Sequence, residues 1–317
     1  MFNYKKKAAL MSALLLTSGA ALADYPEKPI TLIVGFSAGG GTDVMARNVA
    51  PFIEKYLGDG ASIVVKNMPG ASGQIGITEV AHSDPDGYTL GTYNLPGMMA
   101  RTLDRDAKYD AESFTYLANV VSDPNVIVTS KRSGITTAQQ FIEQAQEAPR
   151  SITVGMSSLG GDDHLGLTKF QNITDTEYTI IPFKGSSAAR TAILGGHVSA
   201  GVLNISEVAA FKDELNVIGV AKAERSEYAP NVPTFAEQGV DFTNGALRGF
   251  VAPAGLPEDI QAKLLDAFDK ATKDPELLAK MKATANPVEV TLGEDFEQLN
   301  NELHDLANQV WQTTPWK

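Results

Sequence analysis

The chain has 317 residues, no cysteine, and 38 acidic against 26 basic side chains, for a formal net charge of −12 at pH 7. An acidic surface argues against nucleic acid as a partner, because a phosphate backbone is bound through lysine and arginine. A chain without cysteine does not depend on disulfide bonds, which fits an exported protein among others. The length is sufficient for two domains of ordinary size.

The first 23 residues have the composition of a cleaved export signal. Lys5 to Lys7 form a positive segment, residues 8–17 are apolar, and Ala21-Leu22-Ala23 has the small-x-small form of a cleavage site. An apolar run of this length is too short to anchor the chain in a bilayer, which requires about 20 residues. We therefore expect cleavage after about Ala23 and a mature protein in a bacterial periplasm.

The stretch from Ile30 to Asp43 is expected to form a buried strand, a glycine-rich turn and the start of a helix. Residues 30–36 are mainly β-branched or apolar, which favours a strand. The glycines at 39–41 allow positive φ angles and let a ligand approach the backbone closely. The first N–H groups of the following helix have no partner inside that helix, so an anion is the expected occupant of the turn.

A second strand–loop–helix unit and a third strand follow. The strand over 62–68 leads into the glycine-rich loop 69–73 and a helix over 74–81. The third strand, over 88–94, ends at Asn94. This alternation of strands and helices is typical of a parallel sheet.

The alternating pattern restarts near residue 114. Strands are expected over 116–121, 125–130, 151–156, 179–183, 198–203 and 216–221. Helices are expected over 137–148, 163–172, 186–194 and 205–211. Two of the connections are again built from small residues, namely 157–164 and 184–187. After residue 229 the chain continues with a strand over 246–252 and helices that begin near 257, 275 and 294.

These elements form two α/β lobes, with the second inserted into the first. Lobe 1 is expected over residues 24–113 and 227–317, and lobe 2 over residues 114–226, so the chain crosses between them twice. In open α/β sheets, ligands bind beyond the carboxyl ends of the strands. Small-residue loops recur at four such positions here, and this recurrence predicts a ligand site at the strand ends.

Nucleotide binding and catalysis are weaker interpretations of the same loops. The consecutive glycines 39–41 lack the G-x-G-x-x-G spacing of a dinucleotide site, and no P-loop lysine follows them. His164 lies near Ser157, but the G-x-S-x-G turn of a serine hydrolase is missing, and the four histidines lack metal-ligand spacing. Asp162 and Asp163 are better explained as helix caps, because carboxylates repel an anion. A turn that only packs a helix on a strand stays as the structural alternative.

An ordered set of short motifs runs through the mature chain. The set is Tyr25-Pro26-x-Lys28-Pro29-Ile30, Gly39-Gly40-Gly41-Thr42-Asp43, Asn67-x-Pro69-Gly70-Ala71-x-Gly73, Asp84-Pro85-Asp86-Gly87-Tyr88-Thr89-Leu90, Asp163-His164-Leu165, Phe183-Lys184-Gly185, Leu194-Gly195-Gly196-x-Val198, Val232-Pro233-Thr234 and Ala252-Pro253-x-Gly255. In this order and spacing it closely resembles the Bug-type extracytoplasmic solute receptors of tripartite tricarboxylate transporters. The resemblance covers essentially the whole mature chain.

The resemblance implies an α/β, two-lobe periplasmic-binding-protein fold of type II, and a receptor that is not an enzyme and carries no cofactor or metal. Such a receptor captures a small organic carboxylate, most often a di- or tricarboxylate, by lobe closure. It then delivers the ligand to the integral membrane subunits of a tripartite tricarboxylate transporter. A ligand sensor that feeds a membrane signalling protein is the alternative, and a periplasmic enzyme that uses His164 is a weaker one.

The residues expected to bind the ligand belong to the small-residue loops. The resemblance implies that the glycine loop and the loop after strand two hold one carboxylate, and that the inserted lobe supplies the rest of the site. The full set is Phe36, Ser37, Ala38, Gly39, Gly40, Gly41, Thr42, Gly70, Ala71, Ser72, Gly73, Asn94, Ser157, Ser158, Gly160, Gly161, His164, Lys184, Gly185, Ser186 and Asn204.

Overall fold

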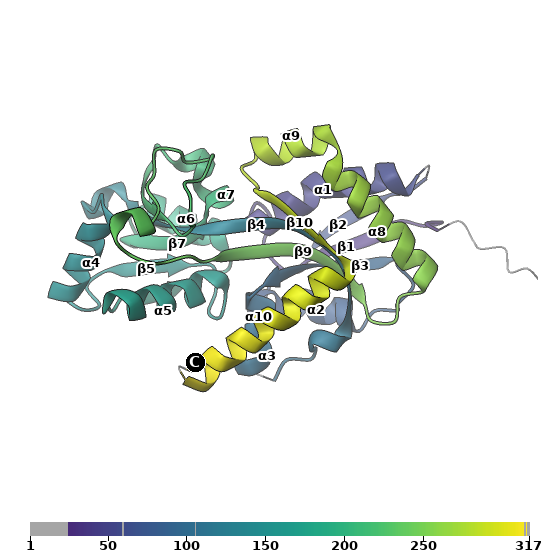
Figure 1. The fold of residues 1–317 in the computed structure, drawn as a ribbon, viewed down its shortest axis with the longest axis horizontal. Coiled ribbons are helices and arrows are strands. Elements are labelled where there is room, and N and C mark those ends of the chain that lie inside the picture. Colours follow the sequence, from purple (N-terminus) through teal and green to yellow (C-terminus); the bar gives the residue numbers. More distant parts are fainter. Residues whose placement is uncertain (1–24, 59, 105, 314, 316–317) are drawn as a thin grey trace, which may run out of the picture.

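The computed structural model describes residues 25–58, 60–104, 106–313 and 315. The expected export signal, residues 1–23, lies outside the described residues. Figure 1 shows two lobes joined by the long strands β4 (Phe114–Ser130) and β9 (Gly245–Pro253), which we call the crossing strands. The two-lobe α/β fold expected from the sequence is confirmed.

None of the helices in the described part of the chain is both long enough and apolar enough to span a membrane.

Lobe 1 is built on a parallel sheet that β9 extends. The strands β1 (Ile30–Val34), β2 (Ile63–Asn67) and β3 (Thr89–Leu95) lie in the order β2-β1-β3, and β9 pairs antiparallel with β3. Its helices are α1 (Gly41–Leu57), α2 (Gln74–Ala81), α3 (Gly97–Asp104), α8 (Glu258–Lys273), α9 (Pro275–Ala283) and α10 (Gly293–Thr313).

The alternation of side chains along β1 gives lobe 1 its two helical layers. Ile30, Leu32 and Val34 belong to the core on one face, together with α1, α8 and α9. Ile33 belongs to the core on the other face, with α2, α3 and α10. Figure 1 shows the same two layers above and below the sheet.

Lobe 2 is a smaller α/β unit on the other side of the crossing strands. Its strands are β5 (Thr153–Met156), β6 (Thr179–Pro182), β7 (Ala200–Asn204) and β8 (Leu215–Val220). Its helices are α4 (Ala138–Glu147), α5 (Asp162–Thr174), α6 (Ser186–Leu194) and α7 (Ile205–Val208). The division at residues 113/114 and 226/227 stays a prediction, although Phe235 and Phe242 pack in the core of lobe 2 with Phe141 and Phe170.

β4 is a single strand of 17 residues where the sequence led us to expect two. Its first half pairs with β9 and with β10 (Val288–Leu292), and its second half pairs with β7 and β8. The change of partner falls between Pro124, which faces Gly245, and Asn125, which faces Asn204. Proline has no backbone N–H, so it fits a point where the hydrogen-bonded ladder changes partner.

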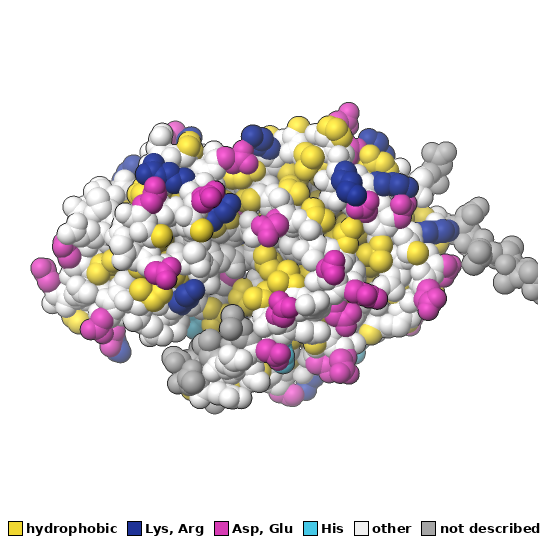
Figure 2. All heavy atoms as spheres, viewed as in Figure 1, with side chains coloured by type: hydrophobic (Ala, Val, Ile, Leu, Met, Phe, Trp, Pro, Cys, Tyr) yellow, Lys and Arg dark blue, Asp and Glu magenta, His cyan; other side chains and the backbone are white. Residues whose placement is uncertain are grey.

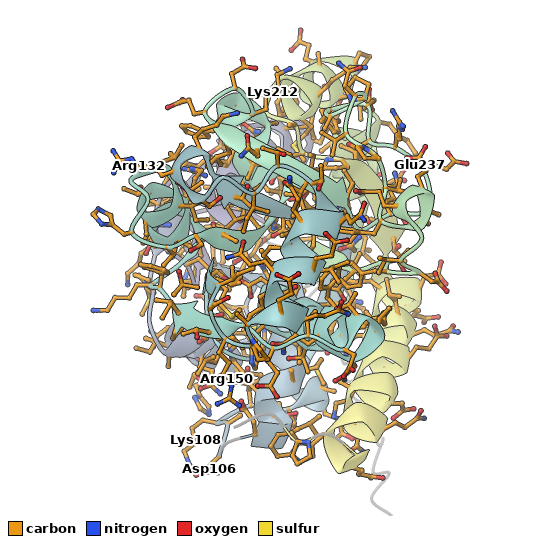
Figure 3. All side chains as sticks on the ribbon, turned by 90° about the vertical axis from the view of Figure 1, so that its left-hand side faces the viewer. Asp106, Lys108, Arg132, Arg150, Lys212 and Glu237 are labelled. Atoms are coloured by element: carbon orange, nitrogen blue, oxygen red, sulfur yellow. The ribbon has the colours of Figure 1, made fainter. Side chains whose placement is uncertain are left out.

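Charged side chains cover the outside of both lobes. On the face shown in Figure 2, lysine and arginine are interspersed with aspartate and glutamate instead of forming a basic patch. Figure 3 shows Arg132, Arg150, Lys212 and Glu237 at the periphery of lobe 2. Arg150 pairs with Glu177 at 2.8 Å, but both side chains are more than half exposed, so the pair contributes little. These surfaces agree with the argument against nucleic acid.

Candidate ligand-binding site

Two adjoining chambers, which share part of their lining, lie between the lobes at the carboxyl ends of strands from both. The inner chamber has a volume of ≈ 40 Å³, enough for roughly three water molecules, and the outer chamber has a volume of ≈ 490 Å³. The two chambers share six lining residues, which are Phe36, Ser37, Ser72, Ser157, Ser158 and Gly185. Lobe 1 and lobe 2 both supply this shared wall, so the site depends on how the lobes meet.

The three consecutive glycines have three different reasons to be glycine. Gly39 has a φ of 77°, which a side chain disfavours. A Cβ on Gly40 would lie 3.3 Å from Oγ of Ser186, across the cleft. A Cβ on Gly41 would lie 2.8 Å from Cζ of Arg248, because the guanidinium packs directly against this glycine. From the sequence we expected positive φ angles to explain all three glycines, but only Gly39 has one.

Two helix N-termini from opposite lobes meet at the inner chamber. Helix α1 starts after Gly40 and helix α6 starts after Gly185, and neither has a side-chain cap. Gly41 and Ser186, the first residues of these helices, both line the chamber. Their N–H groups and the positive ends of the two helices therefore face the same small space, which favours a bound anion.

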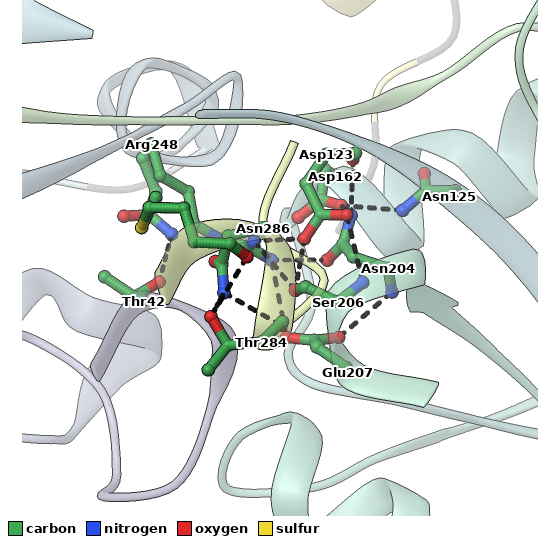
Figure 4. A network of polar contacts seen from close by, with 12 residues as sticks. Thr42, Asp123, Asn125, Asp162, Asn204, Ser206, Glu207, Arg248, Thr284 and Asn286 are labelled. Carbon is green, nitrogen blue, oxygen red and sulfur yellow. Dashed lines mark hydrogen bonds and ion pairs between the residues drawn. The ribbon is translucent and has the colours of Figure 1, made fainter. Parts of the chain in front are cut away.

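Arg248 lines the inner chamber, and its terminal N–H groups are already bonded to the protein, while its buried Nε has no partner among the described residues (Figure 4). Nη1 donates to Asp123 and, at 3.3 Å, to Ser206, while Nη2 donates to Asn204 at 2.9 Å and to Glu207 at 3.5 Å. A guanidinium has four terminal N–H groups, and all four are used here. Its charge acts on the chamber, but these groups cannot also grip a ligand.

Burial is the largest influence on the pKa values of the two acidic partners of Arg248. Asp123 and Glu207 have their pKa values raised because desolvation outweighs the attraction of Arg248. The same two carboxylates raise the pKa of Arg248 against its own desolvation. Arg248, Asp123 and Glu207 form a buried ionic cluster at the crossing strands. Removing one of these charges would leave a buried charge without its partner.

Arg101 is the second arginine in the wall, and it is also fully engaged. Nη1 donates to the carbonyls of Gly97 at 2.7 Å and Gly160 at 2.8 Å. Nη2 donates to Oγ of Ser158 at 2.9 Å and to the carbonyl of Leu159 at 3.0 Å. Again four terminal N–H groups meet four protein acceptors. A carboxylate in the inner chamber must therefore take its hydrogen bonds from backbone N–H groups and hydroxyls.

Asp162 and Asp163 do not cap α5, so that prediction was wrong. The N-cap is Gly161, and it makes no side-chain cap. Oδ2 of Asp162 instead accepts hydrogen bonds from two side-chain amides, those of Asn125 at 2.8 Å and Asn204 at 3.0 Å. Oδ2 of Asp163 accepts from the N–H of Ser157, and burial together with the Asp162 charge raises its pKa to about 7.

His164, on α5, supports the preceding loop Ser157–Gly161, which we call the 157–161 loop. Its Nδ1 accepts from the N–H of Gly160 at 3.0 Å, and the side chain is buried. Burial and then the nearby charge of Arg101 lower its pKa, so the ring is neutral and serves as an acceptor. Among the described residues, no hydroxyl side chain makes a hydrogen bond with the His164 ring, so no nucleophile is paired with it. Within the described residues, no three His, Asp or Glu side chains are grouped as metal ligands.

The structure brings most of the expected site residues together. Those in the wall of the inner chamber are Phe36, Ser37, Gly40, Gly41, Thr42, Ser72, Asn94, Ser157, Ser158, Gly161, Gly185, Ser186 and Asn204. Those that line only the outer chamber are Gly70, Ala71, Gly73 and Lys184. Those that line neither chamber are Ala38, Gly39, Gly160 and His164. A role of any of them in ligand binding stays a prediction.

The sequence argument missed several residues in the wall of the inner chamber. They are Gly97, Met98, Arg101, Asp162, Ser187, Glu207 and Arg248. Arg101 and Arg248 did carry a signal, because each is a charged residue in an otherwise apolar segment, Met98–Arg101 and Leu247–Val251. A buried arginine of this kind needs partners, and apart from the Gly97 carbonyl the described acceptors lie far away in sequence.

A two-lobe α/β fold with a cavity between the lobes is characteristic of a substrate-binding receptor of the periplasmic-binding-protein class. The family model described as "Tripartite tricarboxylate transporter family receptor" matches residues 45–309, and the chain belongs to this family. It is a periplasmic solute-binding receptor and not an enzyme.

Similar proteins include one relative and two solved structures with ligands. "Protein BugT" of Bordetella pertussis is 30% identical over 322 residues, which cover 98% of each chain. The structure "R. palustris Rpa4515 with adipate" has a TM-score of 0.85 at 28% identity and covers 92% of this chain and 98% of that one. MatC from Rhodopseudomonas palustris with bound malate has a TM-score of 0.82 at 26% identity and covers 90% and 99%.

Proposed function

We propose that this receptor captures a small organic carboxylate, with two or three carboxyl groups most favoured, by closure of the lobes. The closed form then delivers the ligand to the integral membrane subunits of a tripartite tricarboxylate transporter. Adipate and malate, bound by two similar proteins, are ligands of this chemical class. A periplasmic location, after removal of residues 1–23, belongs to the same proposal.

The observation that carries the proposal is the meeting of α1 and α6 at one chamber. Two uncapped helix N-termini supply several N–H donors and two partial positive charges within a small volume. The engaged guanidiniums of Arg101 and Arg248 add charge without competing for the hydrogen bonds. Hydroxyls of Thr42 and Ser158 in the same wall add donors for carboxylate oxygens.

The two chambers suggest how a ligand with more than one carboxyl group is held. The inner chamber is small and polar and fits one carboxylate. The outer chamber has room for the rest of the molecule and is lined by Phe36, Phe183 and Lys184. The Lys184 ammonium at this wall is a partner for a second carboxylate.

The test is a binding screen of the purified protein by thermal unfolding and calorimetry. It covers acetate, malate, adipate, citrate, a neutral sugar and the cation putrescine. A ligand present at 100 times its Kd stabilises the folded state by about 2.7 kcal/mol, so the midpoint should rise by roughly 5–10 °C for a matching carboxylate. A response to the sugar or putrescine with none to any carboxylate contradicts the proposal.

A further inference from the structure

Three of the four hydrogen bonds from the Arg101 guanidinium join lobe 1 to lobe 2. Arg101 belongs to α3 of lobe 1 and is 1% exposed. Its partners at Ser158, Leu159 and Gly160 all belong to the 157–161 loop of lobe 2. These three bonds exist only while the 157–161 loop lies against α3, so any opening of the lobes on this side must break them.

The 157–161 loop is shaped from within lobe 2 before Arg101 binds it. Asp163 accepts the N–H of Ser157, and His164 accepts the N–H of Gly160. The N–H groups at these two positions are thus satisfied inside lobe 2, while the carbonyls of Leu159 and Gly160 are left for Arg101. The loop offers a ready set of acceptors, and Arg101 supplies the matching donors from the other lobe.

Other contacts between the lobes are weaker or lie at the crossing strands. Ser37 donates to the carbonyl of Lys184 at 3.2 Å in an exposed position. Lys282 of α9 pairs at 2.6 Å with Glu227, whose neighbours Tyr228 and Ala229 pack in a core of lobe 2, but both side chains are more than half exposed, and water screens such a pair. The bonds of Arg248 lie on β9 beside the crossing point itself. Arg101 is therefore the buried connection on the cleft side of the molecule.

We propose that Arg101 is a positioning residue that locks the 157–161 loop onto lobe 1 and thereby sets how long a ligand is retained. The inference rests on the proposed function, because it concerns release of the ligand captured there. Arg101 acts through the loop and not as a hydrogen-bonding ligand group, since its four terminal N–H groups are already donated to the protein. Its effect is therefore the same for every carboxylate that fits.

The test compares dissociation rates for three probes, malate, adipate and citrate, in the wild type and in Arg101→Ala. The variant leaves three acceptors of the 157–161 loop without their donor, two of them buried, so the rate constant of release should rise at least roughly tenfold for each bound probe. The rate constant of association should change much less. Small-angle scattering with saturating probe should show a larger radius of gyration for the variant than for the wild type.

Two further variants separate a lock from general damage to the fold. Arg132→Ala is the matched control, because Arg132 also donates to a glycine carbonyl, that of Gly195 at 3.0 Å, but within lobe 2 and at the surface. It should release probes at the wild-type rate. Arg101→Lys keeps a positive charge at this position but replaces the forked guanidinium by a single ammonium, so it should speed release in the same direction by a smaller factor. It also serves if Arg101→Ala does not fold.

The outcomes distinguish this inference from the proposed function. If the wild type binds none of the three probes, the proposed function fails, and the inference falls with it. If the wild type binds the probes, and both Arg101→Ala and Arg101→Lys release them at the wild-type rate, the proposed lock is wrong while the proposed receptor function is unaffected. If Arg101→Ala changes the rate constant of release by very different factors for the three probes, the inference is also overturned, because such a difference indicates direct contact of Arg101 with the ligand.

Discussion

Gly41 and Arg248 meet in the wall of the inner chamber, and each restricts the other. The flat guanidinium can take its four partners only because nothing projects from Cα of Gly41. The arginine in turn fixes Asp123 and Glu207, which come from a crossing strand and from α7. A single glycine thus determines whether the ionic cluster at the crossing point can form.

Gly41→Ala should reduce the free energy of unfolding by about 1–3 kcal/mol, because the new Cβ would lie 2.8 Å from Cζ of Arg248. Gly40→Ala is the matched control next to it. The φ of Gly40 is −82°, and the nearest atom to its Cβ would be Oγ of Ser186 at 3.3 Å, so stability should change little. Denaturant unfolding measures both. Equal stability of the two variants contradicts the role given to Gly41.

Three buried carboxylates give the protein an unusual pH dependence. The pKa values of Asp123, Asp163 and Glu207 are all raised in the folded state, that of Asp163 to about 7. The folded state then binds more protons than the unfolded state, so stability is fully present near pH 4 and falls as the pH rises toward 7. One such group contributes a slope of up to about 1.4 kcal/mol per pH unit.

Asp163→Asn tests this dependence, because the amide cannot ionise. Denaturant unfolding of the wild type should give a lower free energy at pH 7 than at pH 5. The variant should show a smaller drop over that interval. Asp106→Asn, a change at an exposed carboxylate, is the control and should keep the wild-type slope. If Asp163→Asn keeps the wild-type slope, Asp163 does not titrate in this range.

At the scale of elements, the loops could be predicted from the sequence and their partners could not. The turns at 39–41, 69–73 and 184–187 are local signals, because glycine and serine at a strand end favour a turn before a helix. Helix α3 was missed because it follows Pro96 and Gly97, which are typical of turns, and Arg101 was missed with it. The single strand β4 was missed for the same kind of reason, since Pro124 reads as a break.

The helix N-termini of α1 and α6 are the elements that the account assigns to anion binding. Ser187→Asp places a carboxylate in the first turn of α6, where the helix dipole stabilises it, so the free energy of unfolding should stay within about 0.5–1 kcal/mol. The same carboxylate faces the inner chamber and repels a bound anion. Carboxylate affinity should therefore fall by at least roughly a hundredfold in calorimetry.

Gln139→Asp makes the same change in the first turn of α4, where the side chain is exposed and lies outside both chambers. Stability should again change little, and carboxylate affinity should equal that of the wild type. Undiminished binding by Ser187→Asp would remove α6 from the site.

At the scale of the whole molecule, the site exists because two chain crossings bring separate lobes together. The crossing strands fix the distance between the lobes, and the ionic cluster of Arg248 lies at their crossing point. The lobes could be predicted from alternating strands and helices. Their contact surface could not, because Arg101 and Arg248 find their partners through long-range packing that local sequence does not encode.

A crystal structure of the purified protein with a carboxylate from the binding screen tests the central claim most directly. The account predicts closed lobes and a carboxylate in the inner chamber, with its oxygens within hydrogen-bonding distance of N–H groups at the starts of α1 and α6. Arg101 and Arg248 should keep the protein partners they have here. A carboxylate bound instead by either guanidinium, or located outside the cavity between the lobes, would contradict the account.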